Sequence, residues 1–390
     1  MRSINPKNVW NFFVAEETRS SSLLVIAGLL GLILANSKMS DLYFSTLHYD
    51  LTFGFVTLDI QHWINEGLMA AFFLVVSLEI KRELIDGELK GWKKASFPVF
   101  GAIGGMILPA LIFTTLNPTL PESKGWAIPM ATDIAIAIGI LGLLGNRISH
   151  SLRVFLLTLA IVDDIGSIAI IGIFYSQPSN MFTFLMALVV VLSVAIVRNS
   201  RHWIMWFGVL GFVLWYLLIL SGVPGTMAGV LMAFLAPLST RRKGSKKLQL
   251  SEVAEDILLP FASFVIVPMF VLANAGIPFS SIELNDHSTI NVFLGVFLGL
   301  VVGKAVGIFI ATKIANVLGF ARKPSGISWS QIAGVGFVAG IGFTVSLLVA
   351  SLSYEDDYVL HNASVMAIFI ASIVSAIIGL FILSRAKDKA

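Results

Sequence analysis

Three aspartates lie inside the most apolar stretches of this 390-residue sequence. Asp133 interrupts WAIPMATDIAIAIGILGLLG, and the adjacent Asp163 and Asp164 interrupt VFLLTLAIVDDIGSIAIIGIF. Lys304, in GLVVGKAVG, is the only cation deep in such a stretch. An ionised carboxylate at the centre of a bilayer costs about 3 kcal/mol on insertion scales, so such residues persist mainly where an ion pathway needs them. The four charges therefore indicate an ion-handling site.

The composition is that of a membrane protein. Hydrophobic residues make up 57% of the chain and charged residues only 13%, whereas about a quarter of the residues in soluble domains are charged. The absence of cysteine excludes a disulfide framework, a thiolate metal site and Cys-based catalysis. The net charge of +3 does not indicate a nucleic-acid partner, because basic residues in membrane proteins concentrate on the cytoplasmic side.

Twelve apolar stretches separated by Gly, Pro, Asn or charged residues predict an all-α polytopic membrane protein with twelve transmembrane helices. They lie at about residues 20–36, 62–86, 96–117, 126–145, 151–176, 180–198, 203–220, 224–238, 255–276, 290–314, 327–351 and 360–384. With the N-terminus in the cytoplasm, nearly all Lys and Arg fall in the inner connections. We therefore expect a single transmembrane domain over residues 1–390, in a lipid bilayer, with both termini cytoplasmic.

Two segments outside these spans are also expected to be ordered. Residues 43–60 alternate large apolar and polar side chains around Gly54, which predicts a small β-hairpin on the outer surface. The hairpin is either a cover over the outer loop or an edge for pairing with a second copy. The first 19 residues lack the apolar core of a signal peptide and are typical of a short amphipathic surface helix.

Two of the spans are poor uninterrupted helices. One carries Pro129 and the pair Thr132–Asp133 near its middle, and the other carries four glycines in VGFVAGIGFTVSLLVA. Pro weakens a helix by about 3 kcal/mol and Gly by about 1 kcal/mol. Backbone bared at membrane depth is tolerated only where it lines a cavity or meets polar groups.

The interrupted spans occupy corresponding positions in two halves of the chain. Counted in threes, the spans in residues 96–176 and 290–384 cross the membrane in opposite senses, and each triplet contains one interrupted span. Interrupted helices in corresponding halves mark a transporter's binding site. We therefore predict two inverted three-helix repeats whose interrupted helices cross at that site.

The buried charges divide into two candidate sets. Asp163 is the proposed partner of Lys304, in either a permanent ion pair or a titrating pair that gives up a proton when a cation arrives. Asp164 and Asp133, with the Thr132 hydroxyl and nearby carbonyls, could hold Na⁺ or Li⁺ through oxygen. Asp133 could instead balance the partial positive charge of broken-helix N-termini. Competition between H⁺ and Na⁺ for these carboxylates, combined with alternating access, is sufficient for antiport.

A second charged group lies at the inner end of the second span. Glu79 and Glu83 share one helical face, flanked by Lys81 and Arg82. The group is either a solvated rim or, together with Glu255, a cytoplasmic funnel that gathers cations and responds to pH. None of the six histidines has metal-ligand spacing, and no cofactor is expected.

The chain closely resembles the NhaA-type bacterial Na⁺/H⁺ antiporters along nearly its whole length, a family that is itself a recognised example of inverted repeats. The matching stretches are WINEGLMAAFFLVVSLEIKREL, FPVFGAIGGMILPAL, GWAIPMATDIAIAIGILGLLG, LAIVDDIGSIAIIGIFY, PMFVLANAG and GIGFTVSLLVASL. The resemblance implies export of Na⁺ or Li⁺ for external protons across the inner membrane, more protons than Na⁺ per cycle, activation at alkaline pH, and a homodimer joined by the hairpin.

The resemblance also implies residue roles. Asp163 and Asp164 match the family's ion-binding, proton-carrying pair. Thr132 and Asp133 match positions at the crossing of the broken helices, and Lys304 matches the charge partner of Asp163. The positions associated with pH response match Glu79, Arg82, Glu83 and Glu255.

The chain departs from the family pattern in two places. Pro224 in SGVPGTMAG stands where relatives carry a His, and EDILLP around Glu255 lacks nearby histidines. A His titrates near pH 6.5, so these losses would move or broaden the pH activation. Glu66 is expected to be either an outer ion entrance or a rim residue.

Three other functions compete with antiport. A sodium-coupled symporter of an organic solute on the same fold is the nearest alternative, but it should scatter polar side chains around a larger substrate. A channel would not need inverted repeats. An intramembrane aspartyl protease should carry a GxGD sequence, and none occurs here. We therefore expect a secondary transporter and not an enzyme.

Overall fold

The computed structural model is mostly helical, which confirms the all-α prediction. It describes residues 6–53, 56–87, 89, 91–145, 148–176, 178–198, 203–237, 258–281 and 286–386. The chain divides into two compact units, each discontinuous in sequence. Unit 1 comprises residues 1–36, 91–167 and 275–390, and unit 2 comprises residues 37–90 and 168–274.

Five described helical segments are long and apolar enough to cross a membrane, or up to eight if each bent helix pair counts as one span. The five are α5 (Trp92–Leu116), α7 (His150–Phe174), α9 (Trp203–Ser221), the run of α14, η8 and α15 (His287–Val317), and α18 (Tyr358–Arg385). Three shorter apolar segments are α8 (Met181–Val197), α10 (Thr226–Leu235) and the run of α12, η6 and α13 (Leu259–Asn274).

The N-terminal helix is longer than the sequence predicted. The expected surface helix and the first span form one continuous helix, α1 (Pro6–Ala35). Proline is favoured in the first turn of a helix, where its missing N–H costs nothing, and no later proline interrupts this one. The prediction of a separate short helix over the first 19 residues is therefore wrong.

Two spans of unit 1 are broken, as the sequence predicted. The 3₁₀ helix η3 (Glu122–Met130) and α6 (Ile134–Leu143) meet at a bend of 41°, and α16 (Trp329–Val338) and α17 (Phe343–Ser353) meet at a bend of 48°. The first break begins two residues after Pro129, and the second contains Gly340 and Gly342. Both breaks therefore lie where backbone propensity is weakest.

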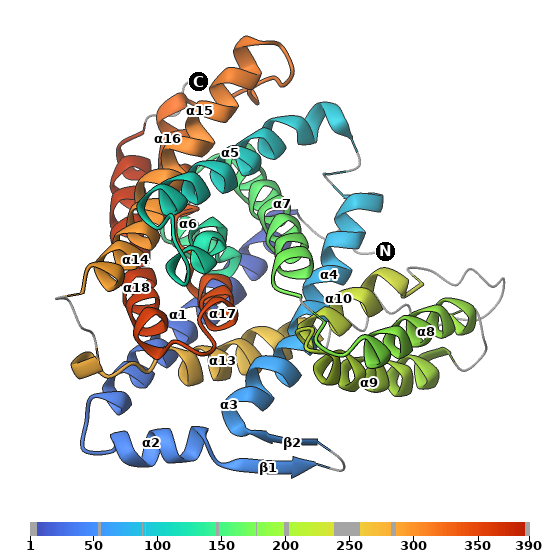
Figure 1. The fold of residues 1–390 in the computed structure, drawn as a ribbon. Helices are drawn as coiled ribbons and strands as arrows, with labels where there is room; N and C mark the ends of the chain where they lie inside the picture. Colours follow the sequence, from blue (N-terminus) through green and yellow to red (C-terminus); the bar gives the residue numbers. More distant parts are fainter. Residues whose placement is uncertain are drawn as a thin grey trace. The chain divides into compact units, whose positions relative to one another are not determined.

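Glycines bring helix backbones into contact inside unit 1. A Cβ added to Gly104 of α5 would lie 2.3 Å from the Gly307 carbonyl oxygen of α15, and a Cβ on Gly307 would lie 2.2 Å from the Gly104 oxygen. Small residues permit this close approach between membrane helices. The α5–α15 contact is therefore made by the main chain at its centre, and in Figure 1 α5 and α15 lie side by side.

Unit 2 contains the only strands among the described residues. After α2 (Ser40–Leu47), β1 (Asp50–Phe53) pairs antiparallel with β2 (Val56–Asp59), with Thr52 opposite Thr57. The hairpin is shorter than the predicted range 43–60, because residues 43–47 complete α2. A helical run of α3 (Ile60–His62), the π-helix η1 (Trp63–Leu68) and α4 (Met69–Asp86) follows. Figure 1 shows α8, α9 and α10 packed beside one another in the same unit.

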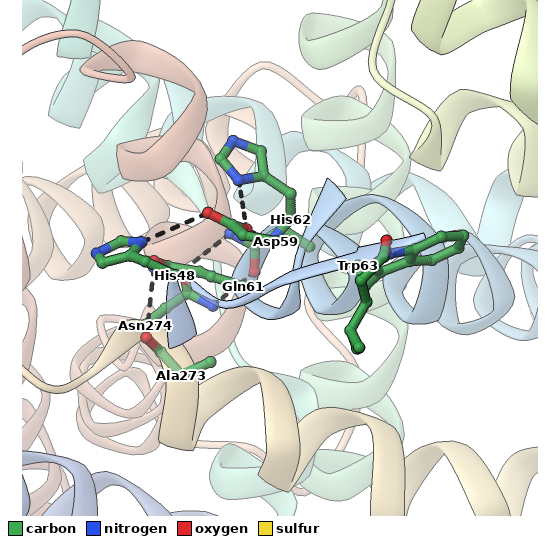
Figure 2. Close-up of polar contacts among 9 residues, drawn as sticks. His48, Asp59, Gln61, His62, Trp63, Ala273 and Asn274 are labelled. Atoms are coloured by element: carbon green, nitrogen blue, oxygen red, sulfur yellow. Dashed lines mark hydrogen bonds and ion pairs between the residues drawn. The ribbon is translucent and has the colours of Figure 1, made fainter. Parts of the chain in front are cut away.

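The base of the hairpin is held by Asp59, as Figure 2 shows. Its carboxylate accepts the backbone N–H of His62 at 2.7 Å and caps α3. The Nδ1 atoms of His62 and His48 lie 2.7 and 3.4 Å from the two carboxylate oxygens. Partial burial raises the pKa of Asp59, but the hydrogen bonds from His62 and His48 and the charge of His62 outweigh this effect, so the pKa lies below its usual value.

Candidate functional site

The two broken spans meet directly at their breaks. The backbone N–H of Asp133 donates to the Ile341 carbonyl at 2.6 Å, and the Thr132 hydroxyl lies 2.8 Å from the Ala339 carbonyl. The Ser346 hydroxyl of α17 donates to the Ile128 carbonyl at 2.8 Å. Main-chain groups freed by one break are thus satisfied by the other, which is the condition for irregular backbone at membrane depth.

Asp133 caps two helices at once. It is the N-cap of α6, where one carboxylate oxygen accepts the Ile136 N–H at 3.0 Å. The other oxygen accepts the N–H and the hydroxyl of Thr344, at 3.2 and 2.7 Å, in the first turn of α17. Helix N-termini carry partial positive charge. The contacts of Asp133 therefore match the charge-balancing interpretation of this residue.

Asp163 and Lys304 form an ion pair in the interior of unit 1. The Lys304 ammonium contacts Asp163 Oδ2, and both side chains are fully buried. The π-helix η8 (Gly299–Gly303) ends immediately before Lys304, and such segments often mark functional sites. The pairing of Asp163 with Lys304 that the sequence suggested is thus present in the structure.

Thr132 joins the ion pair to the helix breaks. Its hydroxyl lies 2.6 Å from Asp163 Oδ2 and 2.8 Å from the Ala339 carbonyl oxygen. A hydroxyl has one proton and can donate to only one of these oxygens at a time. The other Asp163 oxygen, Oδ1, is buried and accepts no hydrogen bond from the described residues.

Asp164 follows Asp163 on α7 and is also buried, with 8% of its surface exposed. Successive residues of an α-helix project about 100° apart, so the two side chains diverge. Contacts of Thr132, Asp133, Asp163 and Lys304 thus connect four buried side chains of unit 1 to the two breaks, and Asp164 is the neighbour of Asp163 on α7.

The family follows from comparison with known proteins. A model of the family described as "Na+/H+ antiporter 1" matches residues 11–383. The chain belongs to this family. It is 43% identical over 385 residues to the Na⁺/H⁺ antiporter NhaA of Shewanella amazonensis, covering 97% of both chains. It is 42% identical over 383 residues to the protein of that name from Shewanella loihica, covering 96% of both. These matches confirm the resemblance that the sequence motifs indicated.

Three of the four residues that the sequence associated with pH response, Glu79, Arg82 and Glu83, lie in the antiporter's unit 2. Glu79 and Glu83 are one helical turn apart near the end of α4, and Arg82 Nη2 lies 3.9 Å from Glu83 Oε1. Glu255 lies outside the residues that the structure describes. The structure therefore places Arg82 and Glu83 together and leaves the association with Glu255 a prediction.

Sequence reasoning missed Thr344, whose hydroxyl and N–H both bind Asp133. A signal for it existed, because Thr344 follows the glycine-rich break by two residues. Polar side chains near the first turn of a helix commonly bond to freed backbone and capping groups. Ser346, two residues later, fulfils the same role towards Ile128.

Proposed function

We propose that this chain is a secondary transporter that exchanges Na⁺ for H⁺ across the bacterial inner membrane, exporting Na⁺ and admitting protons. The observation that carries the proposal is the buried set of Asp163, Asp164 and Lys304 where two broken helices meet, in a member of the Na⁺/H⁺ antiporter 1 family. Charges inside a membrane persist mainly where ions pass. The same site would accept Li⁺, whose oxygen preference is similar.

Asp164 is the proposed carrier of the cation. Without a cation, a carboxylate in so buried a place tends to hold a proton, because desolvation penalises its charged form. Na⁺ arriving from the cytoplasm would displace that proton, and a proton arriving from outside would displace Na⁺. Further oxygen ligands would come from Thr132 and from carbonyls at the helix breaks.

Asp163 is the proposed second proton carrier. When its carboxyl is protonated at Oδ2, it can donate to the Thr132 hydroxyl, and that hydroxyl can donate to the Ala339 carbonyl. When Asp163 is ionised, Lys304 balances its charge. If both aspartates carry protons inward while one Na⁺ moves outward, each cycle moves net charge, and the exchange is electrogenic.

Asp133 contributes to the site mainly by balancing charge. Both of its oxygens accept hydrogen bonds at helix N-termini, so its negative charge is already used to hold α6 and α17 together at their breaks. We therefore propose that Thr132, the residue before it, contacts the ion and that Asp133 does not.

The transport fold proposed for the chain has twelve spans, with inverted repeats at about 96–176 and 290–384. Each of the twelve predicted segments contains helix among the described residues, and each triplet has one broken member. The distribution of Lys and Arg supports cytoplasmic termini.

Two further properties belong to the proposal. Glu79, Arg82, Glu83 and Glu255 gather cations at the cytoplasmic side and adjust activity to pH, and the half-buried state of Glu79 and Glu83 supports this role. The hairpin joins two copies of the chain, supported by its four-residue strands, which leave edges for pairing.

Proton release driven by Na⁺ in membrane vesicles tests the function. Inside-out vesicles with an acid interior should lose their pH gradient on addition of NaCl or LiCl, but not of choline chloride. Vesicles carrying Asp164→Asn serve as the matched control. Absence of any response from about pH 6 to about pH 9, the range in which His and raised carboxyl groups titrate, would remove antiport from consideration. A response only with an added organic solute would favour the symporter.

A further inference from the structure

Helix α10 of unit 2 is too short to span a membrane by itself. Its ten residues, Thr226–Leu235, measure about 15 Å, half of the about 30 Å of a hydrocarbon core. Its two ends therefore cannot both reach the membrane surfaces. Each helix end leaves unsatisfied N–H or C=O groups, and inside a membrane these need partners from the protein.

Glu66 supplies the partner at the start of α10. Its carboxylate accepts a hydrogen bond from the N–H of Gly225, the N-cap residue. The main chain of Glu66 is fixed as well, because Trp215 Nε1 donates to its carbonyl at 2.8 Å. A Cβ on Gly225 would lie 2.9 Å from Glu66 Oε2, so glycine gives the carboxylate its access. A negative charge suits this positive helix end.

Lys81 supplies the partner at the other end. Its ammonium donates to the carbonyls of Phe234 at 2.7 Å, Ala236 at 2.5 Å and Ala233 at 3.3 Å. An ammonium has three protons to donate, and here all three point at the last carbonyls of α10. A positive charge again suits the partial negative charge of a helix C-terminus. The sequence alone indicated Lys81 only as a flank of the acidic pair.

The middle of α10 contacts α4, the helix that also carries Lys81. A Cβ on Gly229 would lie 2.0 Å from the Ala70 carbonyl oxygen and 2.8 Å from the Leu74 nitrogen, so the backbones of α10 and α4 are in direct contact. Glu66 and Lys81 both belong to the continuous helical run of η1 and α4. One helix thus holds α10 at its start, middle and end.

We propose that Glu66 and Lys81 are positioning residues for ion exchange. We call their contacts with Gly225 and with residues 233–236 the α10 clamp. The clamp makes η1, α4 and α10 move as one body and fixes the inner end of α4, which carries Arg82 and Glu83. This inference rests on the cytoplasmic role proposed for those residues. Neither clamp residue needs to touch the transported ion, and the clamp acts on the rate of the conformational step.

Spin labels test the clamp without measuring transport. The chain has no cysteine, so labels can be attached at Ala71→Cys on α4 and Phe234→Cys on α10, whose side chains are exposed. Electron-spin distance measurements should give one narrow distribution in the labelled parent and a broadened one in Lys81→Met. Lys81→Arg, which keeps a charged donor, should restore the narrow distribution. Lys313→Met, at an exposed lysine of α15, should leave it unchanged.

Two results would overturn the clamp. One is a distribution in Lys81→Met as narrow as in the parent, and the other is a broad distribution in the parent itself. If Lys81→Met does not insert into membranes, Glu66→Gln in the same labelled background releases the opposite end and is judged by the same criterion.

Kinetics separates positioning from general structural support. Glu66→Gln and Lys81→Met should lower the maximal exchange rate by about fivefold or more, because conformational steps set the rate of many such cycles. The apparent KM for Na⁺ should change by less than about twofold, since the ion-site residues are untouched. Asp41→Asn, at an exposed carboxylate of α2, should change neither. Unchanged rates, or a rise in KM alone, would refute the positioning role. A parent without Na⁺-driven proton release would refute the proposed antiport instead, while the label distances still judge the clamp.

Discussion

Replacement of Asp133 should show whether this residue holds helices or holds the ion. In Asp133→Ala, the donors that lose their acceptor are Ile136 N–H, Thr344 N–H and the Thr344 hydroxyl. Loss of an N-cap costs about 1 kcal/mol for each of α6 and α17. A buried hydroxyl left without a partner costs about 1–3 kcal/mol more. We therefore expect Asp133→Ala to lower the free energy of unfolding by about 3–5 kcal/mol.

Asp133→Asn should fall between the parent and the alanine variant. Its amide oxygen can still cap one helix, but its NH₂ group faces donors at the other. Asp133→Asn loses one cap and the negative charge near two helix N-termini, which should lower the free energy of unfolding by about 1–3 kcal/mol. Thr344→Val is the matched control, since it removes only the hydroxyl contact. It should lower the free energy of unfolding by about 1–2 kcal/mol.

Thermal unfolding in detergent, with and without NaCl, measures both properties of Asp133. A ligand present at about 100 times its Kd stabilises the state that binds it by about 2.7 kcal/mol. If Asp133 balances helix ends, all three variants unfold at lower temperature but keep the stabilisation by Na⁺. An Asp133→Asn protein that unfolds like the parent and no longer responds to Na⁺ would refute this reasoning and make Asp133 an ion ligand.

Three further predictions concern other residues. Asp164→Asn should abolish exchange while the protein still inserts, and near-normal Na⁺-driven proton release from vesicles would remove Asp164 from the mechanism. Lys304→Ala should lower the free energy of unfolding by about 3–5 kcal/mol, because it leaves the charge of Asp163 buried without a partner. An unchanged unfolding temperature would contradict the pairing. Asp59→Asn should speed hydrogen exchange in residues 50–53 and 56–59 at neutral pH. The pKa of Asp59 is lowered in the folded protein, so its ionised carboxylate stabilises the hairpin at every pH above the ordinary pKa of an aspartate. This difference from the parent should disappear as the pH falls through the lowered pKa, and a difference that persists below it would contradict the role of the charge.

The sequence predicted those parts of the site where a buried charge or a helix-breaking residue is energetically unfavourable inside a membrane. A buried lysine demands a carboxylate, so the pairing of Lys304 with Asp163 could be expected from the amino-acid sequence alone. Pro129 and the glycines of VGFVAGIGFTVSLLVA predicted where the helices break, because Pro and Gly are the residues least favourable to a helix.

Other features depended on tertiary contacts that local patterns do not encode. The place of Thr344 two residues after the glycine-rich break hints at a contact with capping groups, but only the meeting of the two breaks shows that its partner is Asp133. The sequence indicates Lys81 only as a flank of the acidic pair, because nothing in its neighbourhood reveals that its partners lie about 150 residues later. The length of α1 was missed because a change in polarity need not end a helix when no breaker is present.

The contact between Gly104 and Gly307 has a consequence for how unit 1 changes shape. Packed helices usually shear past one another through small rearrangements of interlocking side chains. At this point α5 and α15 have no side-chain layer between them, since the main chains themselves touch. Any shear between α5 and α15 at this point would move main chain against main chain, and side-chain rotamers there cannot absorb it. Hinges are another route for motion within unit 1, and the described chain has irregular backbone at residues 131–133 and 339–342, which includes Thr132, a proposed ligand of the sodium ion.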